Sequence, residues 1–224
     1  MGDKYRQINL FGETPPTVVL TNQVRTKGWV GGSASIYRTL GASNHTDKER
    51  QVDDFYATDS IAIDCLLEKA NLSHNLWECA CGEGDLSKRL EELGYNVKST
   101  DLVYRGYGTG GIDFLKCREV FDGDIITNPP YKYAQEFVEH SLKLLPSGRK
   151  SSMFLKLQFL EGKSRRLLFD SGQLKTLYVC SRRILCAKNG EFQKMRDAGG
   201  SALAYGWYEF EKGYCGDPTI KWIN

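Results

Sequence analysis

From residue 60 onward, apolar positions alternate between the spacing of helices and that of strands. Apolar side chains three and four positions apart predict helices at residues 60–70, 85–93, 134–145 and, more briefly, 163–170. Short apolar runs bounded by turn residues predict seven strands, at residues 76–80, 96–102, 112–115, 124–127, 152–159, 174–180 and 202–210. Residues 218–224 are expected to form a tail.

Strands separated by helical connections predict an α/β fold, with a mostly parallel seven-stranded sheet and helices on both faces. Ligands of such sheets bind outside the carboxyl ends of the strands, near the point where the strand order reverses. Residues 1–52 lack this alternation: they are rich in turn formers, and only residues 17–20 suggest a strand. We therefore expect an irregular N-terminal arm or lid at residues 1–52 and one folded domain at residues 53–224.

Composition limits the class of protein. Hydrophobic residues make up 41% and charged residues 26% of the 224 residues, which is typical of a globular chain. The net formal charge is +2, but residues 149–224 hold 14 Lys and Arg against 7 Asp and Glu, a net of +7 that leaves −5 for residues 1–148. A basic C-terminal part is compatible with a phosphate-facing surface and equally with scattered solvated side chains.

The seven cysteines are odd in number and irregularly spaced, which indicates reduced thiols and a cytoplasmic protein. The first ten residues are polar, so neither a signal peptide nor a membrane span is expected. Cys79 and Cys81 have no second cysteine pair at a suitable spacing, and no metal site is expected.

A glycine turn follows the predicted strand at residues 76–80. The sequence Glu78-Cys79-Ala80-Cys81-Gly82-Glu83-Gly84 can turn tightly and bring its backbone close to a ligand. It lacks the third glycine of a dinucleotide fingerprint and the lysine of a P-loop, which disfavours nicotinamide cofactors and nucleoside triphosphates. A tight turn without any ligand is the alternative interpretation.

Acidic residues follow at the two next strand ends. Asp101 is placed to accept hydrogen bonds from both hydroxyls of a ribose, although it could equally be a turn residue. Asp113 could accept from the exocyclic amine of an adenine, while the backbone N–H of Phe114 donates to a ring nitrogen.

The most specific motif is Asn128-Pro129-Pro130-Tyr131, directly after the strand at residues 124–127. The prolines fix an extended backbone and leave carbonyls free to accept. The Asn128 side-chain carbonyl and the Pro129 carbonyl can then hold both hydrogens of one planar amine, which localises its lone pair for attack on a sulfonium methyl group. Tyr131 offers a ring on which a planar base can stack.

Over roughly residues 35–224 these motifs resemble those of class I methyltransferases that modify the exocyclic amines of adenine and cytosine in DNA, and most closely those of small adenine methyltransferases carried by phages and mobile elements. Asn128, Pro129, Pro130 and Tyr131 match the catalytic motif of that family. The resemblance implies a Rossmann-like fold, S-adenosylmethionine as the cofactor, double-stranded DNA as the partner and methylation of adenine N6.

The resemblance also implies a set of cofactor-binding residues. The segment from Phe55 to Thr58 is similar to the motif that binds the methionine carboxylate through its backbone and threonine hydroxyl, and its place in the chain corresponds to the gamma order of motifs. The implied contacts are Tyr56, Ala57, Thr58, Glu78, Ala80, Gly82, Gly84, Asp101, Leu102, Asp113, Phe114 and Asn128.

In one respect the chain departs from the family, because it has no room for a sizeable target-recognition domain. Residues 28–48, 161–166 and 182–201 are the segments left to contact the nucleic acid, and the last two are rich in Lys and Arg. A base within a duplex would have to be flipped out to reach Asn128. RNA adenine, cytosine N4 and protein glutamine remain alternative acceptors, and a non-catalytic nucleic-acid-binding protein on the same fold remains an alternative class.

Overall fold

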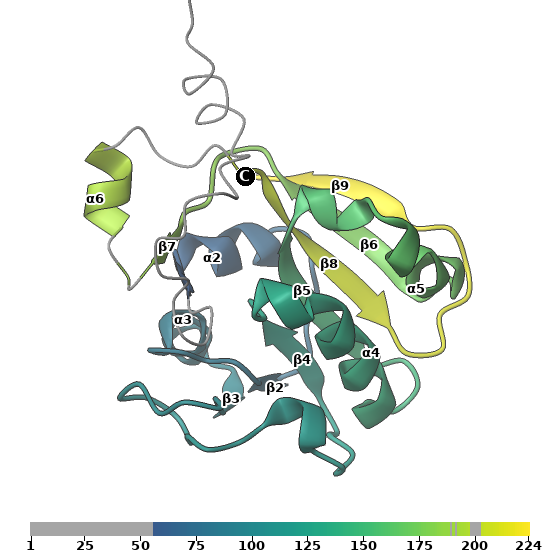
Figure 1. The fold of residues 1–224 in the computed structure, drawn as a ribbon, viewed down its shortest axis with the longest axis horizontal. Coiled ribbons are helices and arrows are strands. Elements are labelled where there is room, and N and C mark those ends of the chain that lie inside the picture. The colour runs from purple at the N-terminus through teal and green to yellow at the C-terminus, as the bar shows by residue number, and fades with distance from the viewer. Residues whose placement is uncertain (1–55, 189, 191, 198–202) are drawn as a thin grey trace, which may run out of the picture.

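The computed structural model of the chain describes residues 56–224 apart from residues 189, 191 and 198–202. Its centre is a seven-stranded sheet in the order β3-β2-β4-β5-β8-β6-β9 (Figure 1). The strands are β2 (Asn75–Glu78), β3 (Asn96–Ser99), β4 (Asp124–Thr127), β5 (Lys150–Lys156), β6 (Leu174–Cys180), β8 (Tyr205–Glu211) and β9 (Thr219–Ile223). Every neighbouring pair is parallel except the two that β8 makes. The expected mostly parallel α/β sheet is confirmed.

Helices cover both faces of this sheet. Side chains of α2 (Ile61–Leu67) and α3 (Asp85–Glu92) belong to one buried apolar cluster, and those of α4 (Ala134–Leu144) and α5 (Arg166–Asp170) belong to the other. Strand β2 contributes to both, because Leu76 faces the first cluster and Trp77 the second, and each is at most 2% exposed. Within the part of the chain that the structure describes, no helix is long and apolar enough to cross a membrane.

Glycines set both ends of α3. Gly84, and not Asp85, occupies the N-cap position, with a φ of +86°, and Asp85 is the first residue of the helix predicted at residues 85–93. Gly94 follows the last turn with a φ of +89° and donates its N–H to the Glu91 carbonyl, as expected of a glycine that ends a helix.

Two expectations about strands are wrong: one expected strand is absent and one unexpected strand is present. The sheet therefore still has the expected seven strands. Residues 112–115 are not a strand: Asp113 accepts from the N–H of Leu115 and caps the 3-10 helix η1 (Phe114–Lys116), which a carboxylate at this position favours. The expected C-terminal tail contains β9, which pairs with β6 at the sheet edge. Residues 219–223 alternate between polar and apolar side chains, which is the pattern of a strand. The strand was missed because this stretch directly follows Pro218.

The remaining boundaries differ from the expected ones by a few residues. β5 begins and ends earlier than expected, and the 3-10 helix η3 (Leu157–Leu160) follows it. The expected helix at residues 163–170 divides into the 3-10 helix η4 (Lys163–Arg165) and α5. β8 begins at Tyr205, whereas β4 and β6 have the expected bounds.

A second, two-stranded sheet lies beside the main one. Strand β1 (Tyr56–Thr58) pairs antiparallel with β7 (Cys186–Lys188), and α6 (Phe192–Asp197) follows in the same connection (Figure 1). The segment at residues 182–201, for which the sequence pattern predicts no helix or strand, therefore contains regular structure. The expected arm at residues 1–52, with its strand at 17–20 and its contact segment at 28–48, lies outside the described residues.

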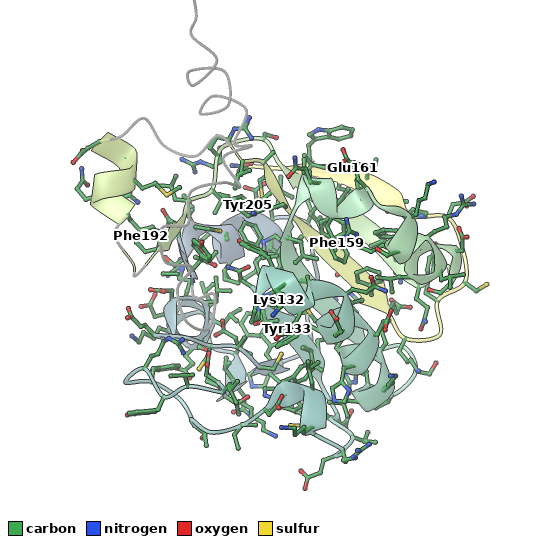
Figure 2. All side chains as sticks on the ribbon, in the orientation of Figure 1. Lys132, Tyr133, Phe159, Glu161, Phe192 and Tyr205 are labelled. Carbon is green, nitrogen blue, oxygen red and sulfur yellow. The ribbon has the colours of Figure 1, made fainter. Side chains whose placement is uncertain are left out.

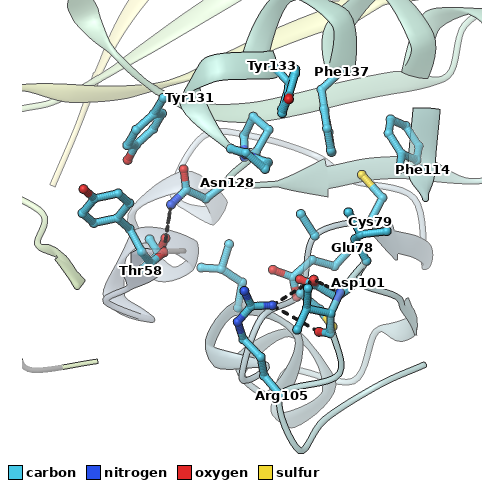
Figure 3. Close-up of a pocket in the computed structure, with 18 of the residues that line it drawn as sticks. Thr58, Glu78, Cys79, Asp101, Arg105, Phe114, Asn128, Tyr131, Tyr133 and Phe137 are labelled. Atoms are coloured by element: carbon cyan, nitrogen blue, oxygen red, sulfur yellow. Dashed lines mark hydrogen bonds and ion pairs between the residues drawn. The ribbon is translucent and has the colours of Figure 1, made fainter. Parts of the chain in front are cut away.

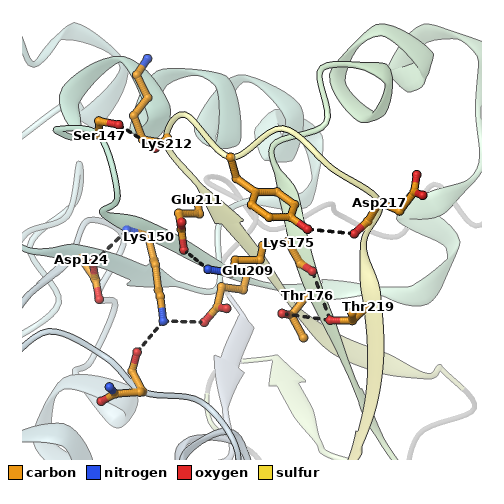
Figure 4. Close-up of polar contacts among 12 residues, drawn as sticks. Asp124, Ser147, Lys150, Lys175, Thr176, Glu209, Glu211, Lys212, Asp217 and Thr219 are labelled. Atoms are coloured by element: carbon orange, nitrogen blue, oxygen red, sulfur yellow. Dashed lines mark hydrogen bonds and ion pairs between the residues drawn. The ribbon is translucent and has the colours of Figure 1, made fainter.

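A polar cluster lies at the amino ends of β4, β5 and β6 (Figure 4). Lys150 forms an ion pair with Glu209 at 3.6 Å, and Lys175 forms one with Glu211 at 2.6 Å. Glu209 is only 2% exposed, and burial raises the pKa of its carboxyl while Lys150 and Lys175 oppose the shift. The Asp124 carboxylate accepts from the backbone N–H of Lys150 at 2.8 Å. This cluster lies at the end of the sheet opposite the carboxyl ends of the parallel strands.

Candidate active site

A cavity of about 1000 Å³ opens at the carboxyl ends of β2 and β4 (Figure 3). It lies where a sheet of this topology binds its ligands. It brings together nearly all of the candidate residues from separate parts of the sequence, namely Tyr56, Ala57, Thr58, Glu78, Ala80, Asp101, Leu102, Asp113, Phe114, Asn128, Pro129, Pro130 and Tyr131. Gly82 and Gly84 are the candidates that do not line it.

The two glycines set the path of the turn after β2, next to the residues that line the cavity. The backbone N–H of Gly82 donates to Oδ2 of Asp101 at 2.8 Å, which joins the turn after β2 to the end of β3. A Cβ atom at Gly84 would overlap the ring of Tyr107, and the φ of +86° also disfavours any other residue there. Direct contact of this turn with a ligand stays a prediction.

Asp101 is already extensively hydrogen-bonded. Besides the bond from Gly82, its Oδ1 accepts from the N–H of Val103 at 2.9 Å and forms an ion pair with Arg105 at 3.2 Å (Figure 3). A carboxylate offers about four acceptor positions, so one remains for a ligand hydroxyl while Arg105 stays in place. Two ribose hydroxyls could bind together only if the Arg105 side chain moved away.

Asp113 and Phe114 lie at the cavity through η1. Oδ2 of Asp113 pairs with the exposed Lys116 at 2.9 Å, so this carboxylate faces solvent more than Asp101 does. Phe114 is 2% exposed and packs against Trp77 and Phe137, with ring centroids 5.3 and 5.0 Å away. Its side chain therefore belongs to the core, and only its edge and backbone are available to a ligand.

The side chain of Asn128 has a fixed orientation. Its Nδ2 donates to Oγ1 of Thr58 at 2.7 Å and to the backbone carbonyl of Tyr56 at 3.4 Å. Because a carbonyl only accepts hydrogen bonds, the contact with Tyr56 identifies the nitrogen of the amide. Oδ1 is buried and has no hydrogen-bond partner among the described residues. Leaving such an acceptor unpaired costs about 1–3 kcal/mol, which a donor from a ligand in the cavity would recover.

Tyr131 begins the 3-10 helix η2 (Tyr131–Tyr133) and lies among other rings. Its centroid is 6.0 Å from that of Tyr56 and 6.2 Å from that of Tyr205. Nζ of Lys156 lies 4.6 Å from the Tyr131 centroid, over the ring. Burial raises the pKa of the Tyr131 hydroxyl well above its ordinary value, so this group stays protonated. Stacking of a base on this ring remains a prediction.

Glu78 is the most deeply buried carboxyl group in the cavity wall. It is 2% exposed, and its Oε2 accepts from the Ser87 hydroxyl of α3. Burial raises the pKa of this carboxyl to about 8, and the bonds from Ser87 oppose the shift. A positively charged ligand group beside Glu78 would favour the ionised form and lower this pKa again.

This raised pKa predicts a pH dependence of stability. The unfolded chain loses the Glu78 proton near pH 4.5 and the folded chain near 8, so between these values unfolding releases a proton and stability falls as pH rises. Between about pH 6 and about pH 7.5, wild type should lose roughly 2 kcal/mol more unfolding free energy than Glu78→Gln, measured by urea denaturation. Glu136→Gln, a change at an exposed glutamate of α4, is the control and should follow wild type. An equal loss in the Glu78→Gln variant would contradict the assignment.

Sequence reasoning missed several residues that line the cavity. They include Arg105, Lys132, Tyr133, Phe137 and Lys156. Lys156 could have been found, because it ends β5, which is parallel to β4 and adjacent to it. Arg105 has no comparable signal, since it lies in the irregular segment between β3 and η1.

The basic segments expected to contact nucleic acid are partly engaged within the protein. Arg165 donates to the carbonyls of Phe159 and Glu161, and Arg166 pairs with Asp170 at 2.7 Å. Arg196 of α6 pairs with Asp59 at 2.9 Å. Lys132 and Tyr133, in contrast, lie side by side and exposed at the cavity, apart from Phe192 on α6 (Figure 2).

All seven cysteines are free thiols. Among the residues that the structure describes, no group of three or more His, Cys, Asp or Glu side chains is placed to hold a metal ion.

Comparison with solved structures identifies the fold. A candidate class I S-adenosylmethionine-dependent methyltransferase from Listeria monocytogenes superposes with a TM-score of 0.50 at 11% identity, over 83% of this chain and 70% of that one. The chain has the Rossmann-like fold of class I methyltransferases. No protein-family model matches the sequence, and no curated protein does.

Other proteins with this fold carry different names. The modification subunit of a candidate type I restriction enzyme from Vibrio vulnificus has a TM-score of 0.50 at 13% identity, and the match covers 82% of this chain but only 49% of that subunit. A candidate hemolysin from Lactococcus lactis has a TM-score of 0.51 at 10% identity, over 73% of this chain and 91% of that one. At these identities the likeness concerns the fold, and the function must be argued from the cavity.

Proposed function

We propose that this protein transfers a methyl group from S-adenosylmethionine to an exocyclic amine, namely N6 of adenine in DNA. The observation that carries the proposal is the buried, unpaired Oδ1 of Asn128, held at the cavity by the bonds from its Nδ2 to Thr58 and Tyr56. Such an acceptor calls for an N–H or O–H donor from the ligand, and an amine is a donor of the required kind.

The chemistry of the cavity wall fits this cofactor. S-adenosylmethionine, when bound, supplies an electrophilic methyl group on a positively charged sulfur. The carboxyl side chains of Glu78, Asp85, Asp101 and Asp113 line the cavity, and Arg105 pairs with Asp101. A ligand that carries positive charge would favour the ionised form of Glu78 and is favoured by it in turn. Asp101 would take a ribose hydroxyl, and Asp113 with the backbone of Phe114 would hold the adenine. Thr58 and the backbone around it would hold the methionine part.

On the acceptor side, the chain provides a rigid receptor for the two hydrogens of an amine. Oδ1 of Asn128 accepts one of them, and the Pro129 carbonyl is the expected second acceptor. Because Thr58 and the Tyr56 carbonyl fix the amide, the acceptor needs no reorganisation as the amine nitrogen becomes pyramidal. The amine nitrogen would bond to the methyl carbon through its lone pair, while the electrons of the broken S–C bond stay on the sulfur, and one hydrogen of the amine would leave to solvent as a proton.

DNA is the proposed partner for two reasons. The match to a restriction-modification subunit concerns a protein named for the modification reaction of a restriction enzyme. The cavity also carries Lys132 and Lys156 beside aromatic side chains, a combination that suits a base extruded from a polyanionic strand.

The proposal is tested by expressing the protein in a bacterial host that lacks DNA methylation and sequencing the host DNA with a method that detects N6-methyladenine and N4-methylcytosine directly. N6-methyladenine at a short defined motif, absent from the Asn128→Ala strain, is the expected result. N4-methylcytosine would replace adenine by cytosine in the proposal. Unmodified DNA, together with calorimetric binding of S-adenosylmethionine, would overturn the DNA assignment and favour RNA or protein acceptors. Failure to bind the cofactor as well would favour the non-catalytic alternative.

A further inference from the structure

Lys156 ends β5 and is the only lysine besides Lys132 among the described residues that line the cavity. It is half-buried, and its Nζ lies 4.6 Å from the ring centroid of Tyr131. Its position on the sheet is fixed, because it pairs with Tyr205 of β8 and its carbonyl accepts from the Tyr208 hydroxyl. The charge is therefore held against the aromatic residue of the proposed catalytic motif.

The two lysines at the ends of β5 have different surroundings. Lys150, at the amino end, forms an ion pair with Glu209 and donates to the Asn71 carbonyl at 2.7 Å (Figure 4). Lys156, at the carboxyl end, forms no ion pair with any Asp or Glu that the structure describes. A half-buried cation without an internal counter-charge is well suited to an anionic ligand.

Charge is divided within the cavity. The carboxyl groups of Glu78, Asp85, Asp101 and Asp113 come from the segments around β2, α3, β3 and η1, the part proposed to hold the cofactor. Lys132 directly follows Tyr131 in η2, and Nζ of Lys156, from β5, lies over the Tyr131 ring. Arg105 also lines the cavity, on the cofactor side, but it pairs with Asp101. Among the described residues, Lys132 and Lys156 therefore place cations without a carboxylate partner on the acceptor side.

We propose that Lys156 binds a backbone phosphate next to the target base, and that the acceptor is accordingly a nucleotide within a strand and neither a free nucleoside nor a protein amide. The inference rests on the proposed function and specifies how its substrate is recognised. An extruded base carries its own flanking phosphates to the mouth of the site, within reach of a lysine beside the stacking ring.

The test measures kcat/KM for methyl transfer to sheared, unmethylated genomic DNA at several NaCl concentrations. Replacing Lys156 by methionine should lower kcat/KM roughly tenfold at low salt, the typical effect of losing one charged hydrogen bond. It should also reduce the slope of log kcat/KM against log salt by about 0.9, the contribution of one phosphate contact on duplex DNA. Lys156→Arg, which keeps the charge, should retain the wild-type slope.

The control is Lys143→Met, which removes the same charge from an exposed position on α4 and should leave both quantities unchanged. A Lys156→Met variant with the wild-type slope would overturn the inference even if kcat fell, because a lysine that only orients Tyr131 does not change the number of phosphates bound. Wild type that transfers no methyl group to DNA would overturn the proposed function together with this inference. Transfer by wild type with identical slopes in all variants would overturn the inference alone.

Discussion

Replacing Asn128 by alanine is expected to lower kcat for methyl transfer by about a hundredfold to a thousandfold while changing the cofactor dissociation constant less than about threefold. The variant loses Oδ1, the acceptor proposed to hold the amine as its nitrogen changes geometry. The contact is strongest when the nitrogen is pyramidal, so its loss should reduce kcat more than substrate affinity. Single-turnover transfer of a labelled methyl group to DNA measures the first quantity, and calorimetry with S-adenosylmethionine measures the second.

The matched control for this prediction is Asn75→Ala. Asn75 begins β2 at the opposite end of the sheet and is exposed, and its side-chain Oδ1 accepts from Nδ2 of Asn96 at 3.1 Å. It should keep wild-type activity. Asn128→Ala with wild-type transfer would remove the catalytic role of the motif. A parallel loss of cofactor binding and of urea stability would indicate instead that Asn128 mainly anchors β1 through Thr58.

The parts of the fold that could be predicted from the sequence are those in which local pattern and tertiary environment agree. β4 has the expected bounds because its four residues are buried on both faces and are followed by Asn128 and a proline pair. The end of α3 at Gly94 could be predicted because few other residues adopt a positive φ after a helix. The position of the candidate cavity could be predicted from the strand ends, because the carboxyl ends of adjacent parallel strands lie close together.

The missed parts depend on contacts between distant segments. β7 is only three residues long and exists as a strand because it pairs with β1, more than a hundred positions away. Lys156 lies at the cavity because β5 ends at this residue beside β4, whereas the strand expected at residues 152–159 ended three residues later. The strand expected at residues 112–115 was wrong because Asp113 satisfies a backbone N–H locally, and a pattern of only four residues cannot reveal this competition.

Asp101→Ala is the second substitution with a large expected effect, and this effect is on cofactor binding. The variant should bind S-adenosylmethionine roughly tenfold to a hundredfold more weakly, which corresponds to about 1–3 kcal/mol for a buried hydroxyl left without its acceptor. The carboxylate also accepts from the N–H groups of Gly82 and Val103, so the variant loosens the cavity wall as well. Calorimetric titration with the cofactor measures the effect.

Adenosine and methionine, titrated separately, distinguish the two origins of that loss. If Asp101 binds the ribose, the Asp101→Ala variant should lose affinity for adenosine and keep its affinity for methionine. If the wall merely loosens, both ligands should bind more weakly, and urea should unfold the variant earlier. Asp122→Ala, which removes an exposed carboxylate paired with Arg149 at the amino end of β4, is the control and should bind both ligands as wild type does. Unchanged adenosine affinity in Asp101→Ala would contradict the ribose assignment, because the single acceptor position that Arg105 leaves open on this carboxylate would then have no role in binding.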